Sequence, residues 1–136
     1  MITFEIPGEP KGKGRPRFGN GIAYTPDETR DYEMYVKQCY LNSQKKINLT
    51  ENPIKIRIVA NYKIPTSFSK KKRSAAMSGA IKPTKKPDCD NIIKIICDAL
   101  NLVAYKDDKQ IVECSCIKRY ATDIPCVDVF IEELDG

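Results

Sequence analysis

Residues 54–63, with the sequence IKIRIVANYK, alternate apolar and polar side chains along the chain. Ile54, Ile56, Ile58 and Ala60 therefore fall on one face of an extended segment. This alternation is typical of a strand that packs one face on a hydrophobic core and exposes the other. The chain must accordingly supply further strands to pair with this one and a second layer to cover its apolar face.

Three other segments have strand character, namely residues 2–6, 111–120 and 126–133. Helical spacing of apolar residues predicts a helix over 27–43, with Asp27 as its N-cap, and another over Asn91–Asn101. A short basic helix is expected within 65–79, starting near Ser67 or Ser69 and ending at Gly79. The Gly- and Pro-rich residues 7–17 are expected to form a loop, and residues 81–89 an extended segment. This order predicts an α+β (or α/β) fold, a single small domain over 1–136 with a mixed sheet packed against helices.

Composition removes several classes of chemistry. The chain has no histidine, so Ser-His and Cys-His nucleophile systems are excluded. None of its six cysteines forms a CxxC pair, which favours buried reduced thiols over a structural zinc site. No apolar run approaches the roughly 18 residues of a membrane span, and the first ten residues lack the pattern of a secretory signal. We therefore expect a cytoplasmic protein with no membrane partner.

Residues 85–101, KKPDCDNIIKIICDALN, contain the most informative pattern. On a helical wheel with about 100° per residue, Asp90, Asn91, Lys94 and Asp98 fall within one sector. The opposite side is aliphatic, so this helix would pack on the core and turn a carboxylate–lysine–carboxylate row outward. An ordinary salt-bridged solvent face, with Asp90 as N-cap, would explain this row without any function.

A salt-bridged solvent face on the helix does not explain Asp88. In an extended segment Asp88 and Asp90 would project to the same side, and two such carboxylates repel unless a cation lies between them or one is protonated. A hard divalent cation such as Mg²⁺ prefers oxygen ligands of this kind. A third carboxylate could come from Asp107 or Asp108, which follow the helix after a short loop.

Positive charge is gathered in short blocks, although the net charge is only +5. Such blocks suit contacts to nucleic-acid phosphates, but a solvated surface is an equally common origin. Phe18, Tyr24 or Phe68 could stack on bases, although buried aromatic side chains are the more common case. The basic residues concerned are Lys11, Lys13, Arg15, Arg17, Lys70, Lys71, Lys72, Arg73, Lys85 and Lys86.

The whole pattern resembles the RusA family of Holliday junction resolvases, the crossover junction endodeoxyribonucleases. The resemblance rests on KPDCDNIIKIICDALN and YKDDKQIVE within residues 86–113, supported by GEPKGKGRPR near the start and by PTSFSKKKR. The D-x-D-N-x-x-K-x-x-x-D-A-L spacing followed by D-D-x-Q-V is specific. Ile111 replaces the last valine, which is a conservative departure.

The resemblance implies a role for each matching residue. Asp88, Asp90 and Asp108 would be the catalytic aspartates that bind Mg²⁺, for which Mn²⁺ could substitute, and Lys94 would be the essential lysine. Asn91, Asp98 and Asp107 would support them. Asp107 is the weaker candidate for the third ligand, because adjacent residues of an extended segment face opposite ways. The basic residues would bind the DNA arms.

The resemblance further implies a homodimer that resolves four-way DNA junctions by paired symmetric nicks in recombination and repair. A nuclease for other branched DNA, such as forks and flaps, and a non-catalytic nucleic-acid-binding dimer are the alternatives.

Overall fold

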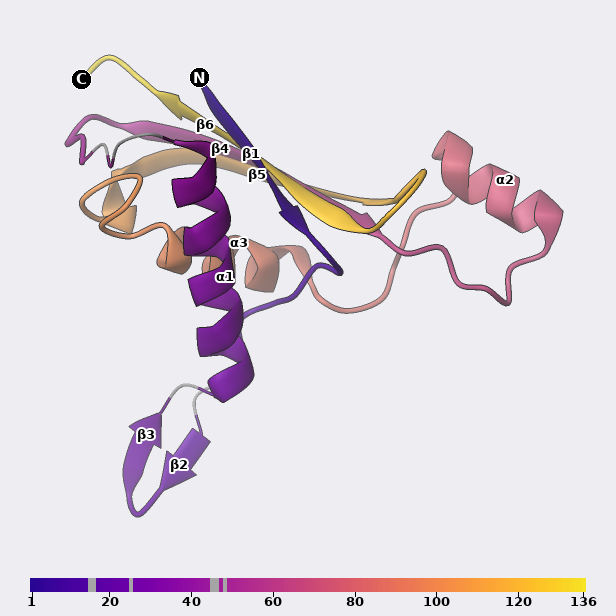
Figure 1. Ribbon diagram of the computed structural model, residues 1–136, viewed down its shortest axis with the longest axis horizontal. Coiled ribbons are helices and arrows are strands. Elements are labelled where there is room, and N and C mark those ends of the chain that lie inside the picture. The colour runs from indigo at the N-terminus through magenta and orange to yellow at the C-terminus, as the bar shows by residue number, and fades with distance from the viewer. Residues whose placement is uncertain (15–16, 25, 45–46, 48) are drawn as a thin grey trace.

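A mixed four-stranded sheet forms the centre of the protein, as a computed structural model shows (Figure 1). The structure describes residues 1–14, 17–24, 26–44, 47 and 49–136. The sheet contains β1 (Ile2–Pro7), β4 (Ile54–Tyr62), β5 (Ile111–Tyr120) and β6 (Cys126–Glu133), in the order β1-β6-β4-β5. β6 pairs antiparallel with both β1 and β4, whereas β4 and β5 are parallel. The chain therefore crosses over between β4 and β5, and this crossover carries two helices.

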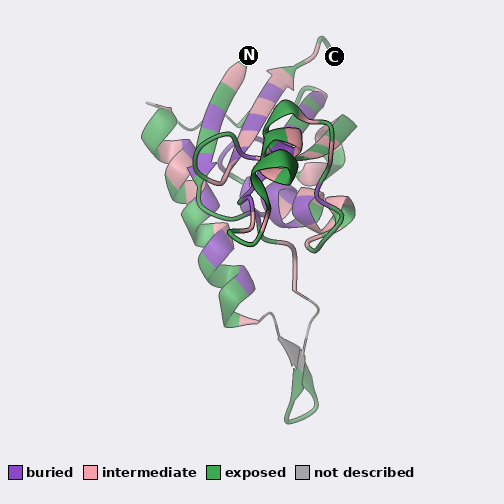
Figure 2. Cartoon of the chain, turned by 90° about the vertical axis from the view of Figure 1, so that its right-hand side faces the viewer, coloured by how far each residue is buried: buried purple, intermediate pink, exposed green. Residues whose placement is uncertain are grey.

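Two helices, α1 (Asp27–Ser43) and α3 (Cys89–Ala99), lie on the same side of the sheet (Figure 1). The alternation in the strands turns one row of side chains toward them, so the core forms between the sheet and this helical layer (Figure 2). β1 supplies Phe4 and Ile6 to this core, and α1 supplies Val36 and Tyr40. Ile54, Ile56 and Ile58 of β4 are each at most 1% exposed, as the alternation predicts.

The helix α2 (Lys70–Ser78) lies apart from this body, at the end of the sheet away from both termini (Figure 1). Ser69 caps it, because its side chain accepts a hydrogen bond from the Lys72 amide at 3.2 Å. Gly79 ends it in the left-handed conformation, with φ +83°. Phe68 anchors the segment by an edge-to-face contact with Tyr120 of β5, at 5.7 Å between ring centroids.

A short hairpin of β2 (Arg17–Gly19) and β3 (Ile22–Tyr24) projects beyond the N-terminal end of α1 (Figure 1). We did not predict this hairpin from the sequence. The available signal was Asn20-Gly21, a dipeptide that favours two-residue hairpin turns because both residues must adopt positive φ. Here Asn20 has φ +53° and Gly21 has φ +77°.

The predicted fold class is confirmed, and most predicted elements have the predicted bounds. The predicted N-cap of α1 and the predicted start of α3 were wrong. Asp27 is the first residue of α1, and Pro26 occupies the N-cap position without any side-chain hydrogen bond. α3 begins at Cys89 rather than Asn91, so Asp88 is at the N-cap and Asp90 lies in the first turn. Among the described residues, no helix combines the length and apolarity that crossing a membrane requires.

Candidate active site

The exposed face of α3 presents its acidic residues because the opposite face is fixed in the core. Ile92, Ile95, Ile96 and Ala99 are fully buried. Asp90, Lys94 and Asp98 are consequently turned away from the core, as the helical wheel predicts. The expectation that Asp88 and Asp90 share a face of an extended segment was wrong, because Asp90 already belongs to the helix. Asp88 has an extended backbone and is exposed, and its side chain does not cap the helix.

A pocket of about 330 Å³ lies between α3 and the start of β5. It brings together four of the predicted site residues, Asp90, Lys94, Asp98 and Asp108, and does not include Asp88. Asp90 and Asp108 are eighteen residues apart in the chain, so only the tertiary fold can place both on one pocket. Its complete lining is Asp90, Ile93, Lys94, Cys97, Asp98, Asp108, Ile111 and Cys114.

Asp107 and Asp108 have different local roles. A single 3₁₀ turn, η1 (Asp108–Gln110), connects the loop after α3 to β5. Asp107 caps this turn, because its carboxylate accepts a hydrogen bond from the Lys109 amide at 2.9 Å, and the Asp107 amide donates to the Gln110 side-chain oxygen at 2.9 Å. Asp108 begins the turn and lines the pocket. The geometry therefore favours Asp108 over Asp107 as the pocket carboxylate.

The pKa of Asp108 is raised, first by partial burial and then by the neighbouring carboxylates of Asp107 and Asp98. The ammonium of Lys94 opposes this shift. A carboxyl group whose pKa is raised by like charges lies where the potential is negative, and a bound cation would relieve that repulsion.

Asp98 is neutralised by two ammonium groups. Its Oδ2 lies 3.4 Å from the Lys94 Nζ and 3.2 Å from the Lys13 Nζ, and Lys13 also contacts Glu33 of α1 at 2.8 Å. Asp98 and Lys13 are about four-fifths buried, whereas the Lys94 side chain is 62% exposed. Asp98 therefore holds Lys94 at the pocket through an ion pair. Its carboxylate is already paired with two lysines, so we do not count it among the carboxylates available to a cation.

The remaining donors are of the kind that a hard divalent cation prefers, although within the described part of the chain Asp88, Asp90 and Asp108 do not form a trio whose ligand atoms all lie within 4.8 Å of one another. Mg²⁺ commonly binds through one or two carboxylates and retains several waters. Asp90 and Asp108 supply two carboxylates in one open pocket, and Asp88 lies at the same end of α3 as Asp90.

Comparison with known proteins assigns the family. The family model for the endodeoxyribonuclease RusA matches residues 7–132, which is nearly the whole chain. The chain belongs to the RusA endodeoxyribonuclease family. It is also 35% identical over 141 residues to the uncharacterized protein YqaN of Bacillus subtilis (strain 168), covering 99% of this chain and 98% of that protein. Membership of the RusA family indicates endodeoxyribonuclease activity.

The predicted DNA-binding residues of this RusA-family chain divide into three groups. Lys70, Lys71 and Lys72 are exposed on α2, although the Lys72 ammonium lies 4.3 Å from the centroid of the Phe68 ring. Arg73 is half-buried and donates to the Pro65 carbonyl. Lys11, Lys85 and Lys86 are also exposed.

Lys13, Arg15 and Arg17 form the third group, near the N-terminus. Lys13 is engaged in its two ion pairs, which favours a structural role over the predicted DNA contact. Arg15 lies outside the described residues, and Arg17 is placed only as a residue of β2. Of the aromatic candidates for stacking, Phe18 is 78% exposed, whereas Phe68 is packed on Tyr120.

The basic loop that precedes the hairpin also holds the start of α3. The Lys13 amide donates to the Asn91 carbonyl at 3.0 Å, and the Gly14 amide donates to the Thr29 hydroxyl at 3.0 Å. A Cβ at Gly12 would lie 2.9 Å from the Cβ atoms of both Asn91 and Pro87, so only glycine permits this approach. Asn91 contacts the loop through its backbone carbonyl, so the supporting role predicted for its side chain stays a prediction.

We expect Gly12→Ala to destabilise the protein by about 1–3 kcal/mol, the usual cost of forcing an extra carbon into a closed contact. The new methyl group would push the loop away from the residues that flank Asp88 and Asp90. Thermal unfolding of Gly12→Ala should therefore show a lower Tm than that of Lys11→Ala, a change at an exposed neighbouring position. An equal Tm for the two variants would contradict the close contact.

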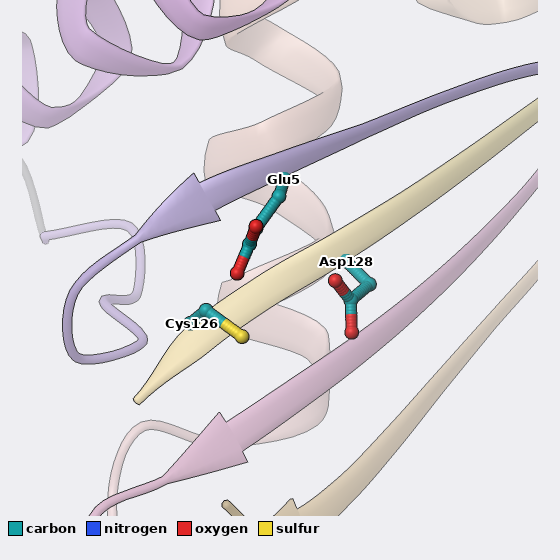
Figure 3. Close-up of side chains that lie close together, drawn as sticks. All are labelled: Glu5, Cys126 and Asp128. Carbon is teal, nitrogen blue, oxygen red and sulfur yellow. The ribbon is translucent and has the colours of Figure 1, made fainter. Parts of the chain in front are cut away.

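A second group of potential metal ligands lies on the other face of the sheet (Figure 3). Ligand atoms of Glu5 in β1 and of Cys126 and Asp128 in β6 lie within 4.8 Å of one another, the one such trio within the described part of the chain. Buried Asn61 donates to Asp128 at 3.1 Å and to the Cys126 sulfur at 3.4 Å. The pKa of Cys126 is raised to about 11 by burial and by the acidic neighbours Glu5 and Asp128. Asn61 thus provides a hydrogen-bond partner for Asp128 and Cys126 without an ion, and we assign the group a structural role.

Sequence reasoning missed the thiols in the pocket. Cys97 and Cys114 line it beside Asp90 and Asp108, and the two thiols shift each other's pKa. Nothing in the spacing of these cysteines, which belong to α3 and β5, could have identified this contact.

Proposed function

We propose that this protein is a metal-dependent endodeoxyribonuclease that resolves Holliday junctions during DNA recombination and repair. The observation that carries the proposal is the pocket in which Asp90 and Asp108 lie beside Lys94, in a chain that belongs to the RusA family. Asp88, Asp90 and Asp108 are the proposed ligands of Mg²⁺ or Mn²⁺. A cation bound there would supply positive charge against a DNA phosphate and acidify a water that can attack it.

The chain's own residues then position the phosphate. Carboxylates alone would repel DNA, so the approach of a phosphodiester depends on the positive charges around the pocket. The Lys94 ammonium is exposed at the pocket and is held by Asp98, which suits it to contact a non-bridging phosphate oxygen. Lys13 shares Asp98 from the buried side and so fixes the carboxylate that orients Lys94.

A homodimer is part of the proposal because a four-way junction has near two-fold symmetry. Two identical subunits related by a two-fold axis would present one pocket to each of two opposing strands. Paired, symmetric nicks would follow from this arrangement. Sedimentation at micromolar concentration should therefore give a mass of two chains, both free and with a junction bound.

A comparison of DNA substrates tests this function. A synthetic four-way junction, a replication fork, a 5′ flap and a linear duplex would each be incubated with the protein and Mg²⁺ or Mn²⁺. We expect paired nicks at symmetric positions in the four-way junction and much slower cleavage of the other DNAs. Preferential cleavage of forks or flaps would instead assign a nuclease for other branched DNA. Binding without cleavage, and no Mn²⁺ binding by calorimetry, would assign a non-catalytic module.

We expect the double substitution Lys70→Ala/Lys71→Ala to weaken junction binding without removing cleavage at saturating protein. Both side chains are exposed on α2, away from the pocket. Removing one lysine–phosphate interaction should reduce the slope of log K against log salt by about 0.9, so the slope should fall by up to about 2. Fluorescence anisotropy with a labelled junction over a series of salt concentrations measures this slope.

The matched control is Lys55→Ala/Lys106→Ala, which removes the same charge. Both of these lysines are exposed but paired, with Glu113 and Glu51, and neither lies on α2. An equal reduction of the slope in the two double variants would mean that α2 acts only through net charge and does not touch DNA.

A further inference from the structure

Two pairs of cysteines connect the same two elements. The thiols of Cys97 in α3 and Cys114 in β5 line the same pocket and shift each other's pKa, and the Cys89 thiol of α3 donates a hydrogen bond to the Cys116 carbonyl of β5 at 3.6 Å. Residues eight apart on a helix, at about 100° each, differ by about 80° and so can both face one neighbouring strand, and residues two apart on a strand share a face. The two contacts therefore lie along a single seam between helix and strand. All four thiols are free.

The Cys97–Cys114 pair differs from the other in its access to solvent. Cys114 is exposed and lines the same pocket as Asp90 and Asp108, so a small solute that enters this pocket can reach its sulfur. Cys97 is only 6% exposed and lies beside Cys114, toward the interior of the protein. An accessible thiol beside a protected second thiol is the arrangement in which an oxidised cysteine is converted to a disulfide.

We propose that Cys114 is an oxidation site in the pocket and that Cys97 resolves it into an intramolecular disulfide. The oxidant is a peroxide. The Cys114 thiolate attacks one peroxide oxygen, the O–O bond breaks, and the sulfur becomes a sulfenic acid as hydroxide leaves. The Cys97 thiol then loses its proton and its sulfur attacks the Cys114 sulfur, so the S–S bond forms, the S–O bond breaks and the hydroxyl leaves as water with that proton. Two thiols supply the two electrons that the peroxide gains, and a dithiol reductant reverses the reaction.

The surroundings of the thiols support the choice of this pair. The neighbouring Cys97 thiol lowers the pKa of Cys114, which favours the Cys114 thiolate, the reactive form, whereas Cys114 and burial raise the pKa of Cys97, which keeps Cys97 protonated until Cys114 is oxidised. Burial and the hydrogen bond with Cys89 instead raise the pKa of Cys116 to about 12. Oxidation should therefore begin at Cys114, whose position also makes it the more accessible thiol.

A disulfide between these residues would alter the pocket. Its two Cβ atoms must lie about 3.8 Å apart, so α3 and β5 would be held together beside Asp90 and Asp108. Displacement of reacting groups by about 1 Å costs roughly 100-fold in rate. The expected loss of nicking rests on the proposed function, whereas formation of the disulfide does not.

Peptide mapping tests the disulfide directly. The full-length protein would be treated with hydrogen peroxide, blocked with N-ethylmaleimide and digested with trypsin, in a Cys116→Ser background because 110–118 contains both Cys114 and Cys116. We expect a crosslink between 95–106 and 110–118 that a dithiol reductant removes and that Cys97→Ser abolishes. It should persist in Cys89→Ser. A crosslink to the peptide that holds Cys89, a disulfide between two chains, or irreversible oxidation of Cys114 without a crosslink would overturn the proposal.

The ratio of nicking rates before and after peroxide measures the consequence. We expect this ratio of rates to be about 100 for the unsubstituted protein. For Cys114→Ser it should be about 1, whatever the absolute nicking rate of that variant. A mapped disulfide with an unchanged rate would overturn the proposed effect on the pocket. If the protein nicks no DNA at all, the proposed function fails, and peptide mapping still decides whether the thiols form the disulfide.

Discussion

Asp90→Asn and Asp108→Asn are each expected to abolish cleavage of a synthetic four-way junction. Both side chains line the pocket, and each substitution removes a charge while keeping the size of the side chain. A neutral amide is a poorer ligand for a hard cation than a carboxylate. The loss should be at least as large as the roughly 10²- to 10³-fold that removal of one charge-stabilising group costs.

Binding of the junction should survive both substitutions or become tighter, because each removes a negative charge that faces DNA. Gel-shift titration without divalent cation measures this separately from cleavage. Calorimetry with Mn²⁺ should show weaker metal binding in both variants. The combination of abolished cleavage, weaker metal binding and retained DNA binding distinguishes a metal ligand from a residue that maintains the fold.

Asp107→Asn and Asp123→Asn are the controls. Asparagine can still cap η1 in place of Asp107, since Asn and Asp are comparable caps, and Asp123 is exposed in the turn between β5 and β6. We expect both variants to cleave at close to the normal rate. Normal cleavage by Asp90→Asn or Asp108→Asn would remove that residue from the site. A loss in Asp107→Asn with normal cleavage by Asp108→Asn would reverse the assignment within the pair.

The strands and helices were predictable where local chemistry determines them. β4, β5 and β6 follow from alternation of apolar residues, and the end of α2 follows from Gly79. The start of α3 was misplaced by two residues because Asp88 and Asp90 are equally good N-cap residues in sequence, and only the backbone distinguishes them.

The candidate site was predictable only in part. One of its features depends on residues that are close together in the chain, whereas the others depend on contacts between residues that are far apart in the chain. Helical spacing alone places Asp90, Lys94 and Asp98 on one face. The presence of Asp108 in the same pocket depends on η1 and on the parallel pairing that brings the start of β5 beside α3. The Lys13–Asp98 ion pair depends likewise on a loop folding back across α3. Neither contact produces a periodic pattern of residues in the sequence.

Ile96→Ala is expected to have the largest effect on stability among substitutions outside the pocket. Ile96 is fully buried in α3 and belongs to the core between the helices and the sheet. Truncation of a buried isoleucine to alanine leaves a cavity and typically costs about 2–5 kcal/mol. Each kcal/mol lowers the Tm of a small domain by roughly 2–8 °C. The free energy of unfolding from urea titration and the Tm from calorimetry measure the effect.

Ile124→Ala is the matched control, because it removes the same atoms from a side chain that is 60% exposed. Its free energy of unfolding should change by less than about 0.5 kcal/mol. Below its Tm, Ile96→Ala should still bind Mn²⁺ and cleave the junction, because the carboxylates of α3 remain in place while the helix is folded. A cost below about 1 kcal/mol for Ile96→Ala, well under the usual range for such a truncation, would mean that α3 is not anchored by its aliphatic face. The placement of Asp90 and Lys94 would then lose its physical basis.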